Sequence, residues 1–291
     1  MRQRNLHLPR GWRHGALALA LFVTGSASAQ SITFDARAGF TYDDNVNRTE
    51  RGRLTEGDGI WSLRGDAGYR RALGTNHGII AKVGLETDIH TDIGDLDVVR
   101  ADTSLSYLLQ PFSGFNAPWF ALSAGFQLAE YAASDIRDGS EARLGVELGQ
   151  RFTDRIAARV GYTARDRDAS KAEVYELRTG TLHAIAEYRF NSRLGAYLKY
   201  DFTHGGVVTG SPRTAKLLAV RRVVARDRVF GPNNVAWRLN GVVHGLRLGS
   251  KIRFSKLTAV DVSAQHSITE ADGDNQWNVW NLSVALNHRF D

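Results

Sequence analysis

The sequence contains no cysteine, one methionine and only five prolines among its 291 residues. Without cysteine, the chain has no disulfide framework, no thiolate zinc site and no lipid-anchored N-terminal cysteine. No proline-rich or serine-rich linker divides it, so a single domain is expected. After residue 30 no stretch approaches the eighteen or so apolar residues of a transmembrane helix. A hydrophobic content of 43% also excludes an intrinsically disordered chain.

Residues 1–29 predict a secretory signal peptide. Several arginines precede a short apolar run from Gly15 to Val23, and Ala27 and Ala29 supply the small residues that a signal peptidase recognises. This segment holds four basic and no acidic residues, so the chain that follows it is almost electrically balanced. The balance removes the main support for a nucleic-acid partner, and none is expected.

From residue 31 onward, apolar and polar residues alternate with the period of a β-strand. In residues 32–42 the even positions are apolar, and polar or charged residues lie between them. The pattern recurs along the whole chain and predicts twelve strands, near residues 32–42, 61–69, 79–89, 97–110, 119–131, 140–152, 156–167, 175–190, 193–203, 236–254, 257–268 and 276–290.

The apolar face of such strands can point into a soluble core or outward to lipid, and three features favour lipid. The strands match the length of about 9–11 residues that a membrane requires rather than the 5–6 typical of globular proteins. Their polar face carries full charges on nearly every strand. The strands that enter short turns end in aromatic residues, as at an interfacial girdle: Tyr69, Phe152, Tyr188, Phe190, Phe254 and Phe290.

Connection lengths also follow the pattern of outer-membrane barrels, in which short periplasmic turns alternate with longer external loops. The short connections are 153–155, 191–192 and 255–256, and the longer ones are 44–57, 131–139, 204–235 and 269–275. The sequence therefore predicts an all-β fold, a single antiparallel transmembrane β-barrel over residues 30–291. We expect it in the outer membrane of a Gram-negative bacterium, with both termini in the periplasm.

The segment from residue 213 to 228 breaks the alternation. One hypothesis is a short amphipathic helix or folded-in loop that narrows the mouth or binds lipopolysaccharide phosphates. A solvated external loop is an alternative, and an additional strand pair, raising the count to fourteen, is another. The basic residues of this predicted external loop are Arg213, Lys216, Arg221, Arg222, Arg226 and Arg228.

The last strand alternates up to a penultimate aromatic residue, Phe290. This ending resembles the terminal-strand signal by which outer-membrane proteins are handed to their insertion machinery, although Asp291 departs from the usual pattern. The resemblance implies the barrel-insertion machinery as a partner, besides the lipid bilayer and lipopolysaccharide. The alternative is a last strand that happens to end in phenylalanine.

The segment 39–48 contains Tyr42-Asp43-Asp44-Asn45-Val46-Asn47 after an aromatic strand. It resembles the opening hairpin of outer-membrane barrels in the surface-lipoprotein-assembly-modifier group and related export barrels. The resemblance implies a barrel and, as an alternative function, export or assembly of a lipoprotein or polysaccharide with periplasmic partners. It carries over no catalytic residue.

The polar face of the strands gives the leading hypothesis for function. Basic residues outnumber acidic ones on this face, which in a water-filled lumen favours anionic solutes. We therefore expect a porin-like channel for small or oligomeric polar solutes with a mild anion preference. The alternative is an interior filled by ion pairs, with no open pore. The residues predicted to line the pore are Arg64, Lys82, Glu86, Arg100, Asp102, Arg143, Glu147, Arg159, Glu187, Lys199, Asp201, Arg247 and Lys251.

A lipid hydrolase on the barrel wall is a second alternative, since His244 and His266 lie on neighbouring predicted strands near the outer leaflet. Ser263 and Ser267 have the opposite parity to His266, so no serine, histidine and acid share a face at the spacing that nucleophile activation needs. The oxygen-rich segments 43–45 and 272–275 lack a calcium-loop pattern and are explained as turns. We expect no enzyme activity, no cofactor and no metal.

Overall fold

The computed structural model describes residues 30–50, 52, 54–220 and 223–290. The predicted signal peptide and the two arginines at 221 and 222 lie outside these described residues. Among the described residues, no helix is long and apolar enough to span a membrane.

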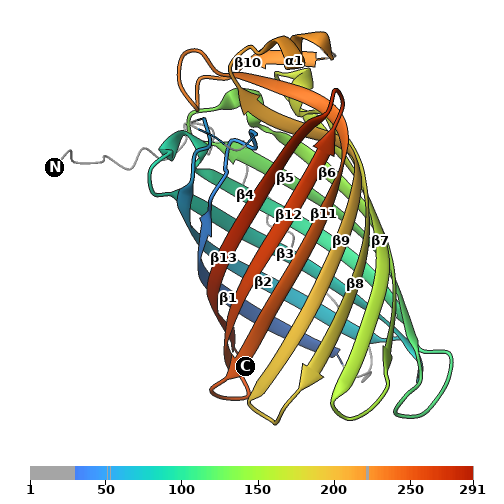
Figure 1. Ribbon diagram of the computed structural model, residues 1–291. Coiled ribbons are helices and arrows are strands. Elements are labelled where there is room, and N and C mark those ends of the chain that lie inside the picture. The colour runs from blue at the N-terminus through green and yellow to red at the C-terminus, as the bar shows by residue number, and fades with distance from the viewer. Residues whose placement is uncertain (1–29, 51, 53, 221–222, 291) are drawn as a thin grey trace, which may run out of the picture.

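Twelve long strands form one closed antiparallel sheet (Figure 1). Strands that follow one another along the chain pair with each other, β11 pairs with β9, and β13 pairs with β1 to close the ring. The structure therefore confirms the predicted twelve-stranded barrel. The wall strands are β1 (Gln30–Asp43), β2 (Asp58–Ala72), β3 (His77–His90), β4 (Val98–Leu109), β5 (Trp119–Tyr131), β6 (Gly139–Arg151), β7 (Ile156–Ala169), β8 (Leu177–Arg189), β9 (Leu194–Ser211), β11 (Val235–Arg253), β12 (Thr258–Ala271) and β13 (Asn275–Phe290).

The remaining elements are short. Three 3-10 turns lie in the connections: η1 (Gly94–Leu96), η2 (Asp135–Arg137) and η3 (Glu173–Tyr175). The segment between β9 and β11 holds the helix α1 (Ala215–Ala219) and the strand β10 (Val223–Arg226). β10 pairs only with the first residues of β11, so it adds no strand to the wall. The alternative of a fourteen-stranded barrel is therefore wrong.

The outer face of the barrel is apolar. Trp61, Leu144 and Leu248 lie within strands and yet expose 60%, 64% and 62% of their surface. The charged residues beside them along each strand point the other way, because successive side chains of a strand alternate between the two faces. Exposed apolar side chains around a closed ring are suited to lipid, and the charged face lines the interior.

Aromatic side chains mark the end of the barrel at which the short turns lie. Phe152, Phe190, Phe254 and Phe290 are each at least half exposed at this end. Tyr188 packs edge-on against Phe190, with ring centroids 4.9 Å apart. This arrangement corresponds to the interfacial girdle that the sequence predicts, at the end that also holds Gln30 and Phe290.

The connections differ in length between the two ends, with two departures from the prediction. The β4–β5 connection, 110–118, is longer than the other turns at the short-turn end. The β12–β13 connection contains only 272–274 rather than 269–275, because Gly273 and Asp274 adopt positive φ angles of 72° and 58° and form a tight turn. Outer-membrane barrels carry short turns in the periplasm and longer loops outside, so we name the short-turn end the periplasmic end and the other the external end.

β9 continues to Ser211, eight residues beyond its predicted end at residue 203. Its pairing with β8 stops at Gly205, whereas its pairing with β11 continues to Ser211. Gly205 has a φ of +126°, and a Cβ atom there would lie 2.1 Å from the carbonyl oxygen of Arg178. Only glycine fits this close approach, at the point where β9 leaves its neighbour in the wall.

Candidate functional site

The thirteen residues predicted to line a pore lie on the interior face, alternating with the exposed apolar residues of the same strands. They come from eight wall strands between β2 and β11. The structure gathers them into three groups, on β2–β4, on β6–β8 and on β9–β11.

Arg64 is the centre of the first group. Its Nη1 donates to Asp102 Oδ1 at 2.7 Å and to Glu86 Oε2 at 3.0 Å, and its Nε donates to Asp66 Oδ2 at 2.9 Å. One guanidinium therefore joins carboxylates from β2, β3 and β4. Such a network is worth more than an isolated surface pair, because each partner is shielded from solvent by the others.

Arg100 extends this network toward the external end. Its Nη1 lies 2.5 Å from Asp88 Oδ2 and 3.9 Å from Glu86 Oε1, and Asp88 also accepts a hydrogen bond from Ser62 at 2.6 Å. We call the six charged residues of this network the acidic patch, since four carboxylates face two arginines. The patch comprises Arg64, Asp66, Glu86, Asp88, Arg100 and Asp102.

The second group lies on β6–β8 and is more nearly balanced. Arg159 reaches Glu187 at 2.9 Å and Glu147 at 3.9 Å, and His183 Nε2 lies 3.1 Å from Glu147 Oε2. Arg143 pairs with Glu141 on its own strand and donates to Gln127 on β5. These side chains therefore cross-link neighbouring strands along the interior wall.

The third group places two cations side by side on neighbouring strands. Lys199 on β9 is in register with Arg247 on β11. Lys199 pairs with Asp201 at 2.9 Å, and Arg247 donates from Nε to the side-chain oxygen of Gln265 at 2.8 Å. In the part of the chain that the structure describes, Arg247 has no carboxylate within ion-pair distance. Lys251, further along the same strand, is exposed and likewise lacks a carboxylate partner there.

The first and third groups lie on opposite walls. Around the ring, β3 and β9 are separated by five strands on either side. The acidic patch on β2–β4 therefore faces Lys199 and Arg247 on β9 and β11 across the lumen. A charged solute in the lumen experiences a field directed from one wall to the other.

The tips of β9 and β11 form a hairpin that leaves the wall. β9 separates from β8 after Gly205, and β11 separates from β12 before Gly241. Between these glycines the described residues 206–220 and 223–240, which we call the lid, lie at the external end (Figure 1). Gly210 donates its N–H to the carbonyl oxygen of Asn47 in the β1–β2 connection at 2.7 Å.

The other side of the lid contacts the β7–β8 connection. Arg238 Nη1 donates to the carbonyl oxygens of Glu173 and Glu176, both at 2.8 Å, and its Nη2 donates to the Glu173 carboxylate at 2.8 Å. Since β1 and β8 lie on different sides of the ring, these contacts tie the lid across the external mouth.

An apolar cluster packs the lid against the interior wall. Trp237 and Leu239 of β11 are each 1% exposed, and they pack with Trp277 and Val279 of β13 and with Leu217 of α1. Trp237 Nε1 donates to the carbonyl oxygen of Ser211 at 3.0 Å, so its polar atom is satisfied. Burial of two tryptophans holds the hairpin inward, over the mouth rather than out in solvent.

Asp227, directly after β10, joins the lid to two further connections. It is 3% exposed and accepts hydrogen bonds from Arg137 Nε at 3.0 Å, from Arg137 Nη2 at 2.7 Å and from the Tyr175 hydroxyl. Burial raises the pKa of Tyr175 above its ordinary value, and the nearby Asp227 carboxylate adds to this. Sequence reasoning missed this group. Its only local signal is that Asp227 is the single acid in the otherwise basic segment 213–228.

The predicted external basic loop is divided between two environments. Lys216 pairs with Glu50 of the β1–β2 connection. Arg213, Arg226 and Arg228 are exposed, and Arg221 and Arg222 lie outside the described residues. The hypothesis of a folded-in segment agrees with the lid geometry, and contact with lipopolysaccharide phosphates stays a prediction.

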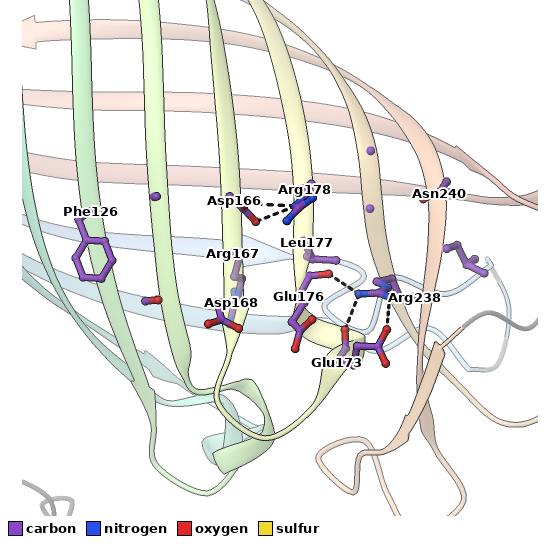
Figure 2. A pocket seen from close by; sticks show the side chains of 15 residues that line it. Phe126, Asp166, Arg167, Asp168, Glu173, Glu176, Leu177, Arg178, Arg238 and Asn240 are labelled. Atoms are coloured by element: carbon purple, nitrogen blue, oxygen red, sulfur yellow. Dashed lines mark hydrogen bonds and ion pairs between the residues drawn. The ribbon is translucent and has the colours of Figure 1, made fainter.

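A polar hollow of about 670 Å³ lies where β9 leaves the wall (Figure 2). Gly205 and Gly206 border it, and Figure 2 shows Asp166 and Arg178 meeting on one side, with Arg238 bound by Glu173 on the other. The Asp166–Arg178 pair is 3.4 Å long and largely exposed. Water-accessible polar space is therefore present beside the lid.

The residues considered for hydrolysis and calcium binding have other partners. His244 Nδ1 lies 2.8 Å from the Tyr200 hydroxyl, and the His266 ring stacks on Trp280 with centroids 4.4 Å apart. The Asp43 carboxylate accepts hydrogen bonds from the Arg48 guanidinium and from the N–H of Asn45, as aspartates in turns commonly do. Within the described residues, no group of three or more histidine, aspartate or glutamate side chains could hold a metal ion.

Comparison with solved structures finds similar outer-membrane channels. The COG4313 outer membrane channel from Pseudomonas putida F1 superposes with a TM-score of 0.58 and 9% sequence identity, over 92% of this chain and 100% of that one. The NanC porin gives a TM-score of 0.46 at 8% identity, over 88% of this chain and 98% of that one. The KdgM porin in complex with disordered oligogalacturonate gives 0.41 at 9% identity, over 88% and 99%.

No protein-family model and no curated protein matches the sequence. At 9% identity the superposition on the COG4313 channel shows a common fold and does not transfer a substrate. The chain therefore has the fold of an outer-membrane β-barrel. The likeness of its opening hairpin to the surface-lipoprotein-assembly-modifier group stays a prediction.

Proposed function

We propose that the protein is an outer-membrane channel for small or oligomeric polar solutes, with a mild preference for anions and with a lid over its external mouth. The observation that carries this proposal is the register of Lys199 and Arg247, two cations opposite each other on the interior face. Asp201 compensates Lys199, so the remaining positive charge of this pair lies on Arg247, and an anion beside Arg247 can neutralise it.

The distribution of ion pairs explains why the preference is mild. In the acidic patch, four carboxylates are held by two arginines, so this wall repels anions. On the opposite wall Arg247 has a neutral partner, Gln265, so its positive charge faces the lumen uncompensated. An anion is drawn to the second wall and held away from the first.

The lid determines when a solute can enter from outside. Trp237 and Leu239 pack beneath it. Arg238 binds the β7–β8 connection, and Asp227 binds the β5–β6 connection. Solute entry therefore requires a rearrangement of this hairpin. Such loop motions fall in the microsecond to millisecond range, which single-channel recording resolves in part.

The first experiment is single-channel recording of residues 30–291, refolded into a planar bilayer with asymmetric salt. We expect discrete current steps and a reversal potential that favours anions. The double variant K199Q/R247Q should lower the anion-to-cation permeability ratio at least twofold. Its matched control is R213Q, which removes an exposed cation of the external loop and should leave the ratio unchanged. An unchanged ratio in K199Q/R247Q would refute the proposed selectivity site.

Deletion of the lid distinguishes a barrel that is closed by its lid from a barrel whose lumen is filled by side chains. The variant removes residues 206–240 and joins Gly205 to Gly241, which lie in register, through a short Asn-Gly turn, which suits a two-stranded hairpin. If the intact barrel conducts rarely and the deletion conducts steadily, the lid is the barrier. Absence of current in both folded proteins would refute the channel.

A further inference from the structure

The periplasmic end of the barrel carries a concentration of positive charge that is separate from the Lys199–Arg247 pair. Basic residues stand at the ends of β6, β8 and β11 and in the turns that join β6 to β7 and β8 to β9. Five of them line one hollow of about 120 Å³ at this end, together with Tyr197. We call this hollow the basic vestibule, and its basic residues are Arg151, Arg155, Arg189, Lys251 and Arg253.

The backbone holds these like charges together. Arg189 donates its N–H to the carbonyl oxygen of Arg155 at 2.8 Å, so β8 and the β6–β7 turn are locked side by side. Arg253 donates in the same way to Arg193 at 2.7 Å, which fixes β11 beside the β8–β9 turn. The cations therefore cannot separate by moving their backbones, and only their side chains can adjust.

Nearby carboxylates do not neutralise the vestibule. Two acids, Asp154 and Glu187, line the same hollow. The Glu187 carboxylate is engaged by Arg159, 2.9 Å away and deeper in the lumen. All five basic side chains are exposed, and within the described chain none of them has a carboxylate at ion-pair distance.

Several basic residues at the external end of the barrel are paired, with Arg48 on Asp43, Arg137 on Asp227 and Lys171 on Asp135. The exposed Arg213, Arg226 and Arg228 of that end line none of the hollows described above. The periplasmic end differs because its unpaired cations are gathered around one hollow. Arginine guanidinium groups bind carboxylate and phosphate groups through two parallel hydrogen bonds, which suits such a site for anions.

We propose that the basic vestibule is a binding site for small multivalent anions that carry two or more phosphate or carboxylate groups. A monovalent anion can satisfy one guanidinium and leaves the other cations unpaired. A multivalent anion engages several cations at once and relieves their mutual repulsion, so affinity rises steeply with charge. The site does not depend on conduction, and it uses the proposed function only to place it at the periplasmic exit of the pathway.

Tripolyphosphate is the first probe, with citrate as the carboxylate counterpart and acetate as the monovalent control. Titration calorimetry on the detergent-folded barrel should show tripolyphosphate binding at low ionic strength, and the binding should weaken steeply as salt is added. The variant R189Q/R253Q should weaken it at least tenfold. The variant R213Q/R228Q removes the same charge at the external end and should leave the affinity within twofold of the wild-type value.

Bilayer recording then locates the site. Because the chain has no cysteine, S192C in the β8–β9 turn gives a unique thiol whose reaction with a charged thiol reagent reports which compartment the turns face. Tripolyphosphate should block current from that compartment at a concentration at least tenfold lower than from the other side.

The outcomes separate the two proposals. Binding that is lost in R189Q/R253Q but occurs in a silent barrel supports the vestibule and counts against the channel. Conduction without tripolyphosphate binding, or binding equally weakened by R213Q/R228Q, overturns the vestibule and leaves the channel standing. If citrate binds as tightly as tripolyphosphate, the site recognises multivalent anions in general. If only tripolyphosphate binds, it is specific for phosphate groups.

Discussion

Asp227 of the lid and Arg137 of the β5–β6 connection form an ion pair of 2.7 Å, although ninety residues separate them in the sequence. The Tyr175 hydroxyl donates to the same carboxylate, so three connections at the external mouth meet at one buried acid. Both partners of the pair are largely shielded from solvent, with side-chain exposures of 3% and 16%. One carboxylate therefore contributes three contacts to the closed mouth.

Replacing this carboxylate should open the lid. In D227A, Arg137 and Tyr175 lose their shared partner, and removing one member of a buried pair costs about 3 kcal/mol. The cost falls on the lid rather than on the barrel wall, so thermal unfolding of the barrel should change little. Single-channel recording should show an open probability several-fold higher. The control D135A removes an exposed partner of Lys171 and should leave gating unchanged.

The apolar cluster under the lid makes a second contribution. W237A removes a side chain that is 1% exposed, and truncation of a buried tryptophan costs about 3–5 kcal/mol. We expect proteases to cut the connection at 212–234 much faster in this variant. W61A, which truncates a tryptophan on the lipid face, should not change the rate of cleavage in this connection. Equal rates in the wild type and W237A would show that the cluster does not hold the lid.

Gating should depend on pH through Tyr175. Because burial raises the pKa of this residue, the folded lid favours the neutral phenol. Its contribution to lid stability is complete below the ordinary tyrosine pKa of about 10 and is lost as the pH rises above that value. We expect the open probability to increase above about pH 10.

The control for this pH dependence is Y175F, which cannot ionise. Any part of the rise that does not come from the phenol of Tyr175 persists in this variant. The difference between wild type and Y175F isolates the phenol. Identical pH profiles would contradict the assignment.

Arg64 should affect both stability and selectivity. In R64M, Asp66, Glu86 and Asp102 lose the guanidinium that joins them, which we expect to destabilise the barrel by about 2 kcal/mol. The exposed carboxylates should also shift the permeability ratio toward cations. Thermal unfolding and reversal potentials measure the two effects. R165M removes an exposed arginine of the interior face that lacks an ion pair in the described chain, and should leave stability unchanged.

The barrel itself could be predicted because its determinants are local. A strand between lipid and water needs apolar and polar side chains in alternation over its whole length. The residues of each strand therefore indicate by themselves which face meets lipid. This is why the predicted strands agree with the structure, in which Arg64, Lys199 and Arg247 alternate with exposed apolar residues. The prediction fails at 204–211, where Gly205 and Gly206 resemble a loop, although the segment pairs with β11.

The sequence by itself therefore determined a twelve-stranded barrel, its lipid-facing side and the charged composition of its interior. The tertiary structure decided which charges neutralise one another, since an ion pair such as Arg64 with Asp102 depends on strands brought together by the sheet register. It also decided that the segment between β9 and β11 folds over the mouth. Asp227 acquires its role only when connections ninety residues apart converge, and no periodicity along the chain encodes that meeting.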